Sequence, residues 1–515
     1  LGRIHDQKAV EPLLAMIKAN NDEDVYLRHA AVLALSRIGQ VEPMAALAKS
    51  PDKSLRIASV LVLRRLKSDK VASFLNDNDE YVATEAARAI NDDESIPTAL
   101  PALASALNDK RFKSEALLRR AINACLRVGG NEQLNQLLAF SKRTDVDKSL
   151  RAEALATLGT WANPSVLDRV DGRYRGNLQH DLASVQKAVQ PSINDLLQAS
   201  DPTVLVAAAQ MASNLGLASA AERMAAIQRE SGSPEVRGAM LTALNTLRYA
   251  GIESALKLGM SDANADVRTV ALGLMRGQNL SGPALAEMSK TIFEKGSEKE
   301  QQQLIQVLGA MPVSKTEPIL LGLIDRMAAK TLPPSLALEL NEAIDSTKSA
   351  PLIAKLAPFR STGMTVADYQ DALFGGDRMA GRRYFMTNST GQCVRCHAIG
   401  GQGGEVGPSL TNIGNVLTRD QLLQALIEPS ARLAPGFGSV MLTLADGQVV
   451  NGILMQESGH ELVLKTTEAE PLKIAVSRIA KRENMPSSMP PMGYLLSKRE
   501  IRDVVEFLSN LKGGR

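Results

Sequence analysis

The pentapeptide CVRCH, Cys393 to His397, places two thiols and an imidazole within about one turn of a short helix. At this spacing each cysteine can form a thioether with one vinyl group of a haem, while the histidine presents its ring to the iron. A structural zinc site requires four ligands, and the only other histidine nearby is His460. A redox dithiol should follow a strand of a βαβ unit, whereas residues 376–385 have a helical pattern. We therefore predict one covalent haem c, bound through Cys393 and Cys396.

Three further segments accompany this motif in a fixed order. They are AGRRYF at 380–385, GPSL at 407–410, and SSMPPMGYLLSKREIRDVVEFLSNLK at 487–512. Together with the motif, they resemble the class I c-type cytochromes. The resemblance implies that a backbone carbonyl at Pro408 accepts a hydrogen bond from the second imidazole nitrogen of His397 and fixes its tautomer. It also implies that a Met-Pro loop supplies the sixth ligand of the iron.

Three methionines compete for the role of sixth ligand. The resemblance favours Met489, which stands directly before a Pro-Pro pair and at the family's distance from a helix beginning near Ser497. Met492 is the next candidate and Met485 the third. A thioether opposite a histidine favours ferrous iron and raises the reduction potential. If all three methionines lined a core instead, the iron would be five-coordinate or bound by another group.

A second pattern fills the chain from its start to about residue 350. An acidic or polar residue is followed by an Ala/Leu-rich helical stretch, and successive starts lie mostly about 27 to 35 residues apart. Asp or Ser can cap the helix start, and apolar residues at helical spacing form a core stripe. The pattern resembles the HEAT-like repeats, which form an α-solenoid. Examples are DVYLRHAAVLALSRIG at 24–39, DKSLRIASVLVLRRL at 52–66, DKSLRAEALATL at 147–158 and SPEVRGAMLTALNTL at 233–247.

One insertion, residues 162–200, breaks the rhythm of the repeats. It carries the polar loop DRVDGRYRG, Asp168 to Gly176. Because Arg and Tyr are favoured at the centres of protein interfaces, this loop is a candidate docking site. The alternative is an ordinary solvated loop, or one packed on the chain's own next domain.

A further insertion is expected inside the C-terminal part. Apolar and polar residues alternate over about 437–483, and Asp446-Gly447 between two such runs is a strong hairpin signal. We predict a small antiparallel sheet there. The fold class is thus mainly α: a HEAT-like α-solenoid, then an all-α class I cytochrome c domain with an inserted β-sheet. The expected domains are 1–360 (solenoid), 361–375 (linker) and 376–515 (cytochrome).

The whole arrangement resembles the large multidomain haem-binding proteins of planctomycete-type bacteria. In that family a sugar-dehydrogenase-like propeller, HEAT-like repeats and a C-terminal cytochrome share one chain, and EPSARLAPGFGSV at 428–440 adds to the likeness. The resemblance implies a redox partner protein or an upstream dehydrogenase domain acting on sugars or alcohols, and a periplasmic or otherwise extracytoplasmic location. The opening LGRIHDQKAVEPLL matches the end of one repeat and the start of the next, so we expect upstream sequence to be missing.

Composition excludes some classes of function. The net charge is only +3, and no basic block with interleaved aromatics occurs, so we expect no nucleic-acid partner. No apolar run approaches the roughly 18 residues of a membrane-spanning helix. Cys125 lies among apolar helix positions and is read as a buried small hydrophobe, and His460 lies in an expected hairpin turn.

Electron transfer by the single haem, displayed on the repeat scaffold, is the leading hypothesis for function. Whether the chain is itself an enzyme is left open. A protein-interaction scaffold with an accessory haem is one alternative. A haem peroxidase-like enzyme is another, although c-type peroxidases usually carry a second C-x-x-C-H motif, which this chain lacks. The sequence leaves the oligomeric state undetermined.

Overall fold

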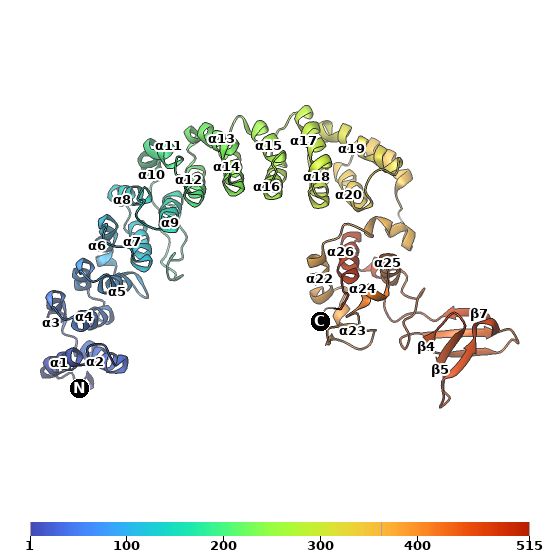
Figure 1. Ribbon diagram of the computed structural model, residues 1–515, viewed down its shortest axis with the longest axis horizontal. Helices are drawn as coiled ribbons and strands as arrows, with labels where there is room; N and C mark the ends of the chain where they lie inside the picture. The colour runs from blue at the N-terminus through green and yellow to red at the C-terminus, as the bar shows by residue number, and fades with distance from the viewer. Residues whose placement is uncertain (1, 362, 514–515) are drawn as a thin grey trace. The chain divides into compact units, whose positions relative to one another are not determined.

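The computed structural model describes residues 2–361 and 363–513, and its contacts divide the chain into two units, Leu1–Leu274 and Met275–Arg515 (Figure 1). The first unit is built of paired helices. They are α1 (Val10–Asn20), α2 (Val25–Ile38), α3 (Val41–Ala46), α4 (Lys53–Arg65), α5 (Glu80–Asn91), α6 (Leu100–Ser105), α7 (Glu115–Val128), α8 (Asn131–Ser141), α9 (Lys148–Gly159), α10 (Leu182–Val189), α11 (Ile193–Leu196), α12 (Pro202–Asn214), α13 (Ala221–Glu230), α14 (Pro234–Thr246), α15 (Ile252–Met260) and α16 (Ala265–Met275).

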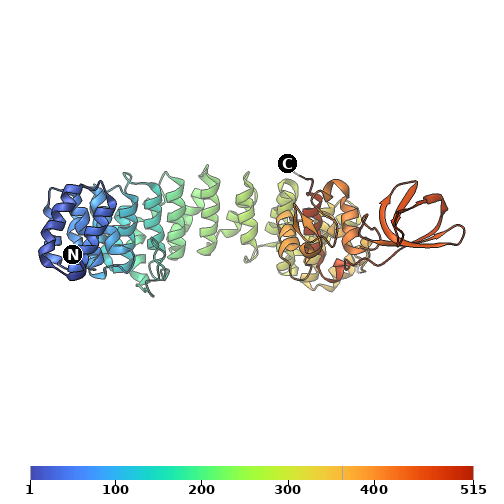
Figure 2. The ribbon, with the colours of Figure 1, turned by 90° about the horizontal axis from the view of Figure 1, so that it is seen from below.

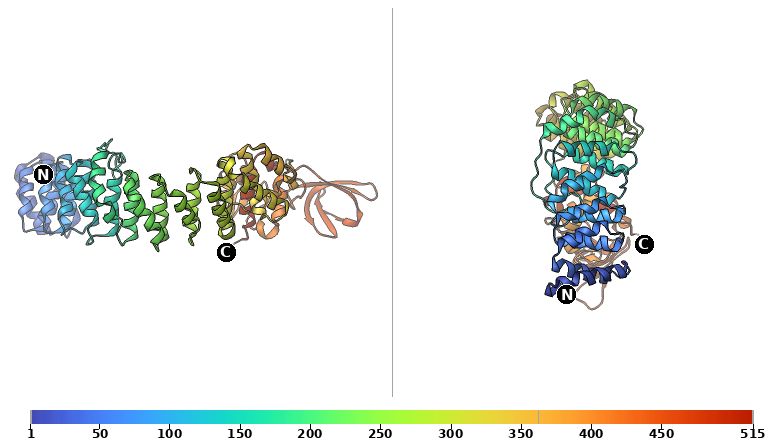
Figure 3. Two further views of the ribbon diagram at one scale, coloured as in Figure 1. Left: turned by 90° about the horizontal axis from the view of Figure 1, so that it is seen from above. Right: turned by 90° about the vertical axis from the view of Figure 1, so that its left-hand side faces the viewer.

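Side-chain caps fix the starts of one row of these helices. In α2, α4, α5, α7, α9, α12 and α14, an Asp or Ser side chain accepts a hydrogen bond from an N–H group of the first turn. Successive members of this capped row pack on one another, and they lie roughly parallel in Figure 3. Their buried faces are mainly Ala, Leu, Val and Ile. The predicted HEAT-like α-solenoid is confirmed.

The second unit begins with more helices of the same kind: α17 (Gly282–Lys295), α18 (Glu298–Ala310), α19 (Val313–Ala328), α20 (Ala337–Thr347) and α21 (Ala350–Leu356). A helical core follows. It consists of the 3₁₀ helix η11 (Val366–Ala372), α22 (Arg378–Thr387), α23 (Cys393–Cys396), α24 (Ile413–Val416), α25 (Arg419–Ile427) and α26 (Lys498–Ser509). Tyr369 and Leu373, within the expected linker 361–375, are buried in this core.

The predicted small antiparallel sheet is present. Its strands are β3 (Ser439–Leu444), β4 (Val449–Glu457), β5 (Glu461–Lys465), β6 (Leu472–Ala475) and β7 (Ile479–Asn484), in the order β6-β5-β4-β3-β7. The Asp446-Gly447 turn joins β3 to β4, with Gly447 at φ 86°. The sheet has its own apolar cluster and lies beyond the helices of the unit in Figure 2. A two-residue hairpin, β1 (Ala398–Ile399) with β2 (Gln402–Gly403), lies beside α23.

Buried ion pairs join the last repeat to this helical core. Glu339 of α20 is fully buried and accepts from Arg502 at 2.8 Å and from Arg499 at 3.2 Å, both on α26. Asn341 of α20 donates to Asp371 of η11 at 2.9 Å, and Lys498 pairs with the same carboxylate at 3.0 Å. The last repeat and the core are therefore linked by hydrogen bonds and ion pairs of buried and half-buried side chains. No helix in the described part of the chain is long and apolar enough to cross a membrane.

Removing the Glu339 charge should loosen α26. We expect Glu339→Gln to cost about 3 kcal/mol, because it leaves Arg502 buried without its carboxylate. Amide hydrogen exchange of α26 in the full chain measures the change, with a loss of protection of about a hundredfold. Glu342→Gln is the matched control, since Glu342 also pairs with Arg499 but is 41% exposed. Equal exchange in both variants would contradict the importance of Glu339.

Candidate functional site

The Cys-x-x-Cys-His segment is held by a turn between α22 and α23. Thr390 and Gly391 donate backbone N–H groups to the Asn388 side chain at 2.8 Å, and Gln392 has a left-handed backbone at φ 46°. The single helical turn of α23 then carries both cysteines. Neither is in a disulfide; Cys393 is half-buried against the helical core and Cys396 is exposed.

The imidazole of His397 is oriented by the loop that follows it. Its Nδ1 lies 2.9 Å from the backbone carbonyl oxygen of Pro408, so Nδ1 carries the proton and donates it, and in the neutral ring Nε2 keeps its lone pair. Gly407 makes this approach feasible, because a Cβ there would lie 2.6 Å from Cε1 of the ring. The N–H of Gly407 donates to the carbonyl of Cys396 at 2.8 Å and closes the loop.

The three methionines differ in their surroundings. Met489 is half-buried and packs against the core cluster that also contacts Cys393 and Val394. Met492 is buried within that core, and Met485 is exposed. Of the three methionines, Met489 is therefore the one that both packs against the core beside Cys393 and is partly exposed to solvent.

Burial disfavours the thiolate form of one of the two cysteines of this segment. Burial raises the pKa of the Cys393 thiol, which keeps it protonated at neutral pH rather than as a reactive thiolate. Burial likewise raises the pKa of Cys125, which lies fully buried in α7. The described residues contain no group of three or more His, Cys, Asp or Glu side chains placed to bind a metal ion.

The insertion loop of the first unit is a short hairpin, closed by an antiparallel bridge between Leu167 and Tyr174. Its backbone is fixed by bonds from the N–H of Asp168 to Arg173 (2.8 Å) and from the N–H of Arg175 to Val166 (2.9 Å). We refer to residues 166–176 as the docking hairpin. The side chains of Asp168 and Arg175 turn toward the neighbouring repeats rather than toward solvent, whereas that of Arg173 is 56% exposed.

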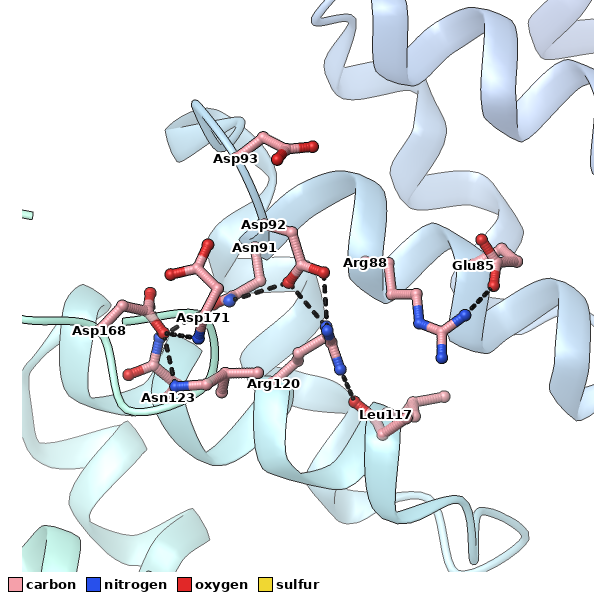
Figure 4. A network of polar contacts seen from close by, with 12 residues as sticks. Glu85, Arg88, Asn91, Asp92, Asp93, Leu117, Arg120, Asn123, Asp168 and Asp171 are labelled. Atoms are coloured by element: carbon pink, nitrogen blue, oxygen red, sulfur yellow. Dashed lines mark hydrogen bonds and ion pairs between the residues drawn. The ribbon is translucent and has the colours of Figure 1, made fainter. Parts of the chain in front are cut away.

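Asp168 is the centre of these contacts. It is 6% exposed and accepts from Arg175 Nε and from Asn123 Nδ2, each at 3.0 Å. Asn123 in turn donates to Asn91 at 2.9 Å, and Figure 4 shows these side chains converging between α5 and α7. Val170 donates its N–H to the other carboxylate oxygen at 2.8 Å.

Arg175 fastens the other strand of the hairpin. Its guanidinium donates to the backbone carbonyls of Asn91 at 2.8 Å and Asp93 at 2.6 Å, and to Asp171 at 2.7 Å. The loop is thus packed on the end of α5, an earlier repeat, which was not among the sequence alternatives. Tyr174 (70% exposed) and Leu167 (51% exposed) remain in solvent.

Two signals in the sequence pointed to this arrangement. Asn91 and Asn123 are amides at positions where the helix pattern calls for apolar residues, and both are buried. Buried amides require partners. The insertion supplies them through Asp168 and Arg175.

Comparison with known proteins gives no family and no curated relative: neither search finds a match. Solved structures do match. A crystal structure of importin beta has 11% identity and a TM-score of 0.41 over 82% of this chain and 61% of its own. Kap121p bound to Pho4p has 12% identity and a TM-score of 0.41 over 92% and 55% of the two chains. The CpcE–CpcF complex of phycocyanin lyase from Nostoc sp. PCC7120 has 15% identity and a TM-score of 0.26 over 54% of this chain and 94% of its own. The chain therefore spans less than two thirds of the importin beta and Kap121p chains.

The prediction of electron transfer as the main function is corrected on these findings. The similar structures are named as importin beta, the karyopherin Kap121p and a phycocyanin lyase complex, and none of these is named as a cytochrome or an electron carrier. The description of the chain as a component of an oxidoreductase is corrected for the same reason. The physical reason is that most of the chain is a solenoid, a fold that presents an extended binding surface. The interaction scaffold, one alternative drawn from the sequence, is better supported.

Burial of Asp168 gives a test of the hairpin's anchoring. Burial alone would raise the pKa of this carboxyl. The N–H groups of Val170 and Asp171 and the Arg175 guanidinium lower the pKa by more than burial raises it, so the net pKa is depressed. The stability it contributes is therefore full above the unfolded pKa of about 3.9 and is lost as the pH falls through the folded pKa.

We expect Asp168→Asn to destabilise the first unit by about 2 kcal/mol at pH 7, because Arg175 loses one of its two carboxylate partners and keeps Asp171 alone. The difference between wild type and variant should shrink below about pH 4. Urea unfolding followed by the fluorescence of Trp161, the chain's single tryptophan, measures both quantities. A difference that stays constant from pH 6 to pH 3 would show that the charge of Asp168 is not responsible.

Proposed function

We propose that the chain is a protein-binding scaffold, and that the docking hairpin is a principal contact with its partner. One observation carries this proposal: Asp168 and Arg175 of the hairpin are bonded to each other and to α5 and α7, while Tyr174 and Leu167 stand exposed on that fixed support. An apolar pair on a rigid hairpin loses little conformational freedom on binding. The expected partner is a protein; the redox role predicted for it is not retained.

Tyrosine suits this position. It offers a large apolar ring with a hydroxyl that can still find a partner, and it is enriched among residues that dominate binding energy. Tyr174 is the strongly exposed aromatic of the insertion. A partner that covered this ring would gain contact area without first ordering the loop.

Truncating Tyr174 tests the scaffold. Proteins retained by the immobilised full chain from an extract of its own cells would be identified, purified and titrated against wild type and Tyr174→Ala. We expect the variant to bind about thirtyfold more weakly, corresponding to about 2 kcal/mol. Tyr26→Ala is the matched control, because Tyr26 of α2 is 82% exposed and lies outside the hairpin. Equal affinity of wild type and Tyr174→Ala for every purified partner would refute a docking role for the hairpin.

We propose in addition that this scaffold carries one accessory haem c. Cys393 and Cys396 would attach the group through thioethers, and His397 and Met489 would bind its iron. Support comes from the 2.9 Å contact of His397 Nδ1 with Pro408, and from the half-buried positions of Cys393 and Met489 at one core. When bound, the group would supply an iron centre. The chain's own part is to hold the imidazole of His397 in one tautomer. Covalent attachment would require maturation outside the cytoplasm, in keeping with the expected location.

Covalent attachment is tested by haem staining after denaturation. The chain, expressed with a c-type maturation system, should keep its haem in denaturing gels, and Cys393→Ser/Cys396→Ser should lose it. Cys125→Ala is the matched control: it removes the third cysteine, buried in α7, and should leave the stain unchanged. Met489→Ala should keep the haem but alter its absorption spectrum. A wild-type chain that never retains haem would overturn this part of the proposal.

A further inference from the structure

A hollow of about 480 Å³ lies beside the docking hairpin, between α7, α9 and α12. It is an open depression of the surface rather than an enclosed cavity, so it suits a single side chain of a docked segment. Small side chains, Ala152, Ala156 and Ala207, line part of its wall. The hairpin contributes Arg169 directly to the wall of the hollow, and Tyr174 lies on the other strand of the same hairpin.

Positive charge is in excess within the hollow. Arg169 donates Nη2 to Thr160 Oγ1 at 2.7 Å and to the carbonyl of Ala156 at 3.3 Å, which are neutral partners. Arg119 donates Nε to Glu153 at 2.9 Å. Two guanidinium groups therefore face one carboxylate.

The remaining charges near the hollow do not cancel this excess. Glu115, which lies 3.8 Å from Arg119, is 69% exposed and screened by water. Asp201, at the start of α12, pairs with Lys148. Among the described contacts of the hollow, the Arg169 guanidinium therefore has no carboxylate within hydrogen-bonding distance.

Burial strengthens the electrostatics of these groups. It lowers the pKa of Arg169, against the opposing effect of Glu153, and it raises the pKa of Glu153, against Arg119 and Arg169. Both shifts report that water is partly excluded. A carboxylate that entered would meet the guanidiniums at a lower effective dielectric than at an open surface.

We infer that this hollow receives a carboxylate side chain from an acidic peptide segment of the partner, with Arg169 as its main contact and Arg119 beside it. A planar guanidinium matches a carboxylate through paired N–H donors. The inference rests on the proposed scaffold function, because the segment would reach the hollow while its neighbours cover Tyr174. It assigns the partner's docking segment to the acidic class.

The test uses the full chain and labelled hexapeptides. Fluorescence anisotropy would measure the binding of fluorescein-labelled hexaglutamate, with a glycine-serine hexapeptide as the neutral control. Trp161 follows Thr160, to which Arg169 is bonded, so its fluorescence gives a second, local readout. We expect hexaglutamate to bind, the neutral peptide not to bind, and Arg169→Gln to weaken binding by about tenfold or more.

A second variant keeps the test valid if Arg169→Gln fails to fold. Gln210 is an exposed residue of α12 on the wall of the hollow, so Gln210→Glu adds a negative charge without removing any contact of the fold. It should weaken hexaglutamate binding by about fivefold. The matched controls are Gln198→Glu after α11 and Arg229→Gln on α13, both exposed and outside the hollow, which should have no effect.

The outcomes separate the inference from the proposal beneath it. Equal weakening by Gln198→Glu and Gln210→Glu would mean general charge attraction and would overturn the inference. Displacement of hexaglutamate by inorganic phosphate as readily as by N-acetylglutamate would overturn it in favour of a small-anion site. An unchanged affinity in Arg169→Gln, with partner binding still dependent on Tyr174, would overturn the inference and leave the scaffold standing. Selective hexaglutamate binding with a partner insensitive to Tyr174 would instead remove the docking role of the hairpin.

Discussion

The buried carboxylate of Asp168 is the constraint on which the first unit's candidate surface depends. A charge removed from water is tolerated only when it is paired and hydrogen-bonded, and Asp168 meets this condition through Arg175, Asn123 and the N–H of Val170. These bonds fix the hairpin against α5 and α7. With Asp168 and Arg175 committed inward, Tyr174 remains outside, and Arg169 extends over α9 toward the hollow.

A comparable constraint operates in the second unit. Glu339 on α20 is shared by two arginines of α26, so the last repeat and the C-terminal core are joined by charges buried between them. The loop of Cys393 and His397 belongs to this same unit. On the proposed function, the repeats supply a binding surface in one unit and a rigid support for the cysteine loop in the other.

Much of the fold could be predicted from local chemistry. Capping residues such as Asp52 and Asp147 mark helix starts, because their carboxylates satisfy N–H groups within three residues, and Asp446-Gly447 gives the turn of β3 and β4 for an equally local reason. The hairpin's packing could not be predicted in this way. Arg175 bonds to Asn91, 84 positions earlier, and no local pattern encodes that distance. The composition of the loop predicted docking through its Arg and Tyr residues together. In the structure Arg175 is bonded to Asp168 and to the end of α5, and only Tyr174 of this pair is exposed.

Amide hydrogen exchange across residues 166–176 would show whether the hairpin is a rigid platform in the free chain, as the docking role of Tyr174 requires. The amides of Asp168, Gly172 and Arg175 all donate within the hairpin. We expect them to exchange nearly as slowly as the amides of α5 and α7, and to become fast in Asp168→Asn. Exchange at the rate of an unstructured loop in the wild-type chain would contradict this role, since the exposed Tyr174 would then have no fixed support.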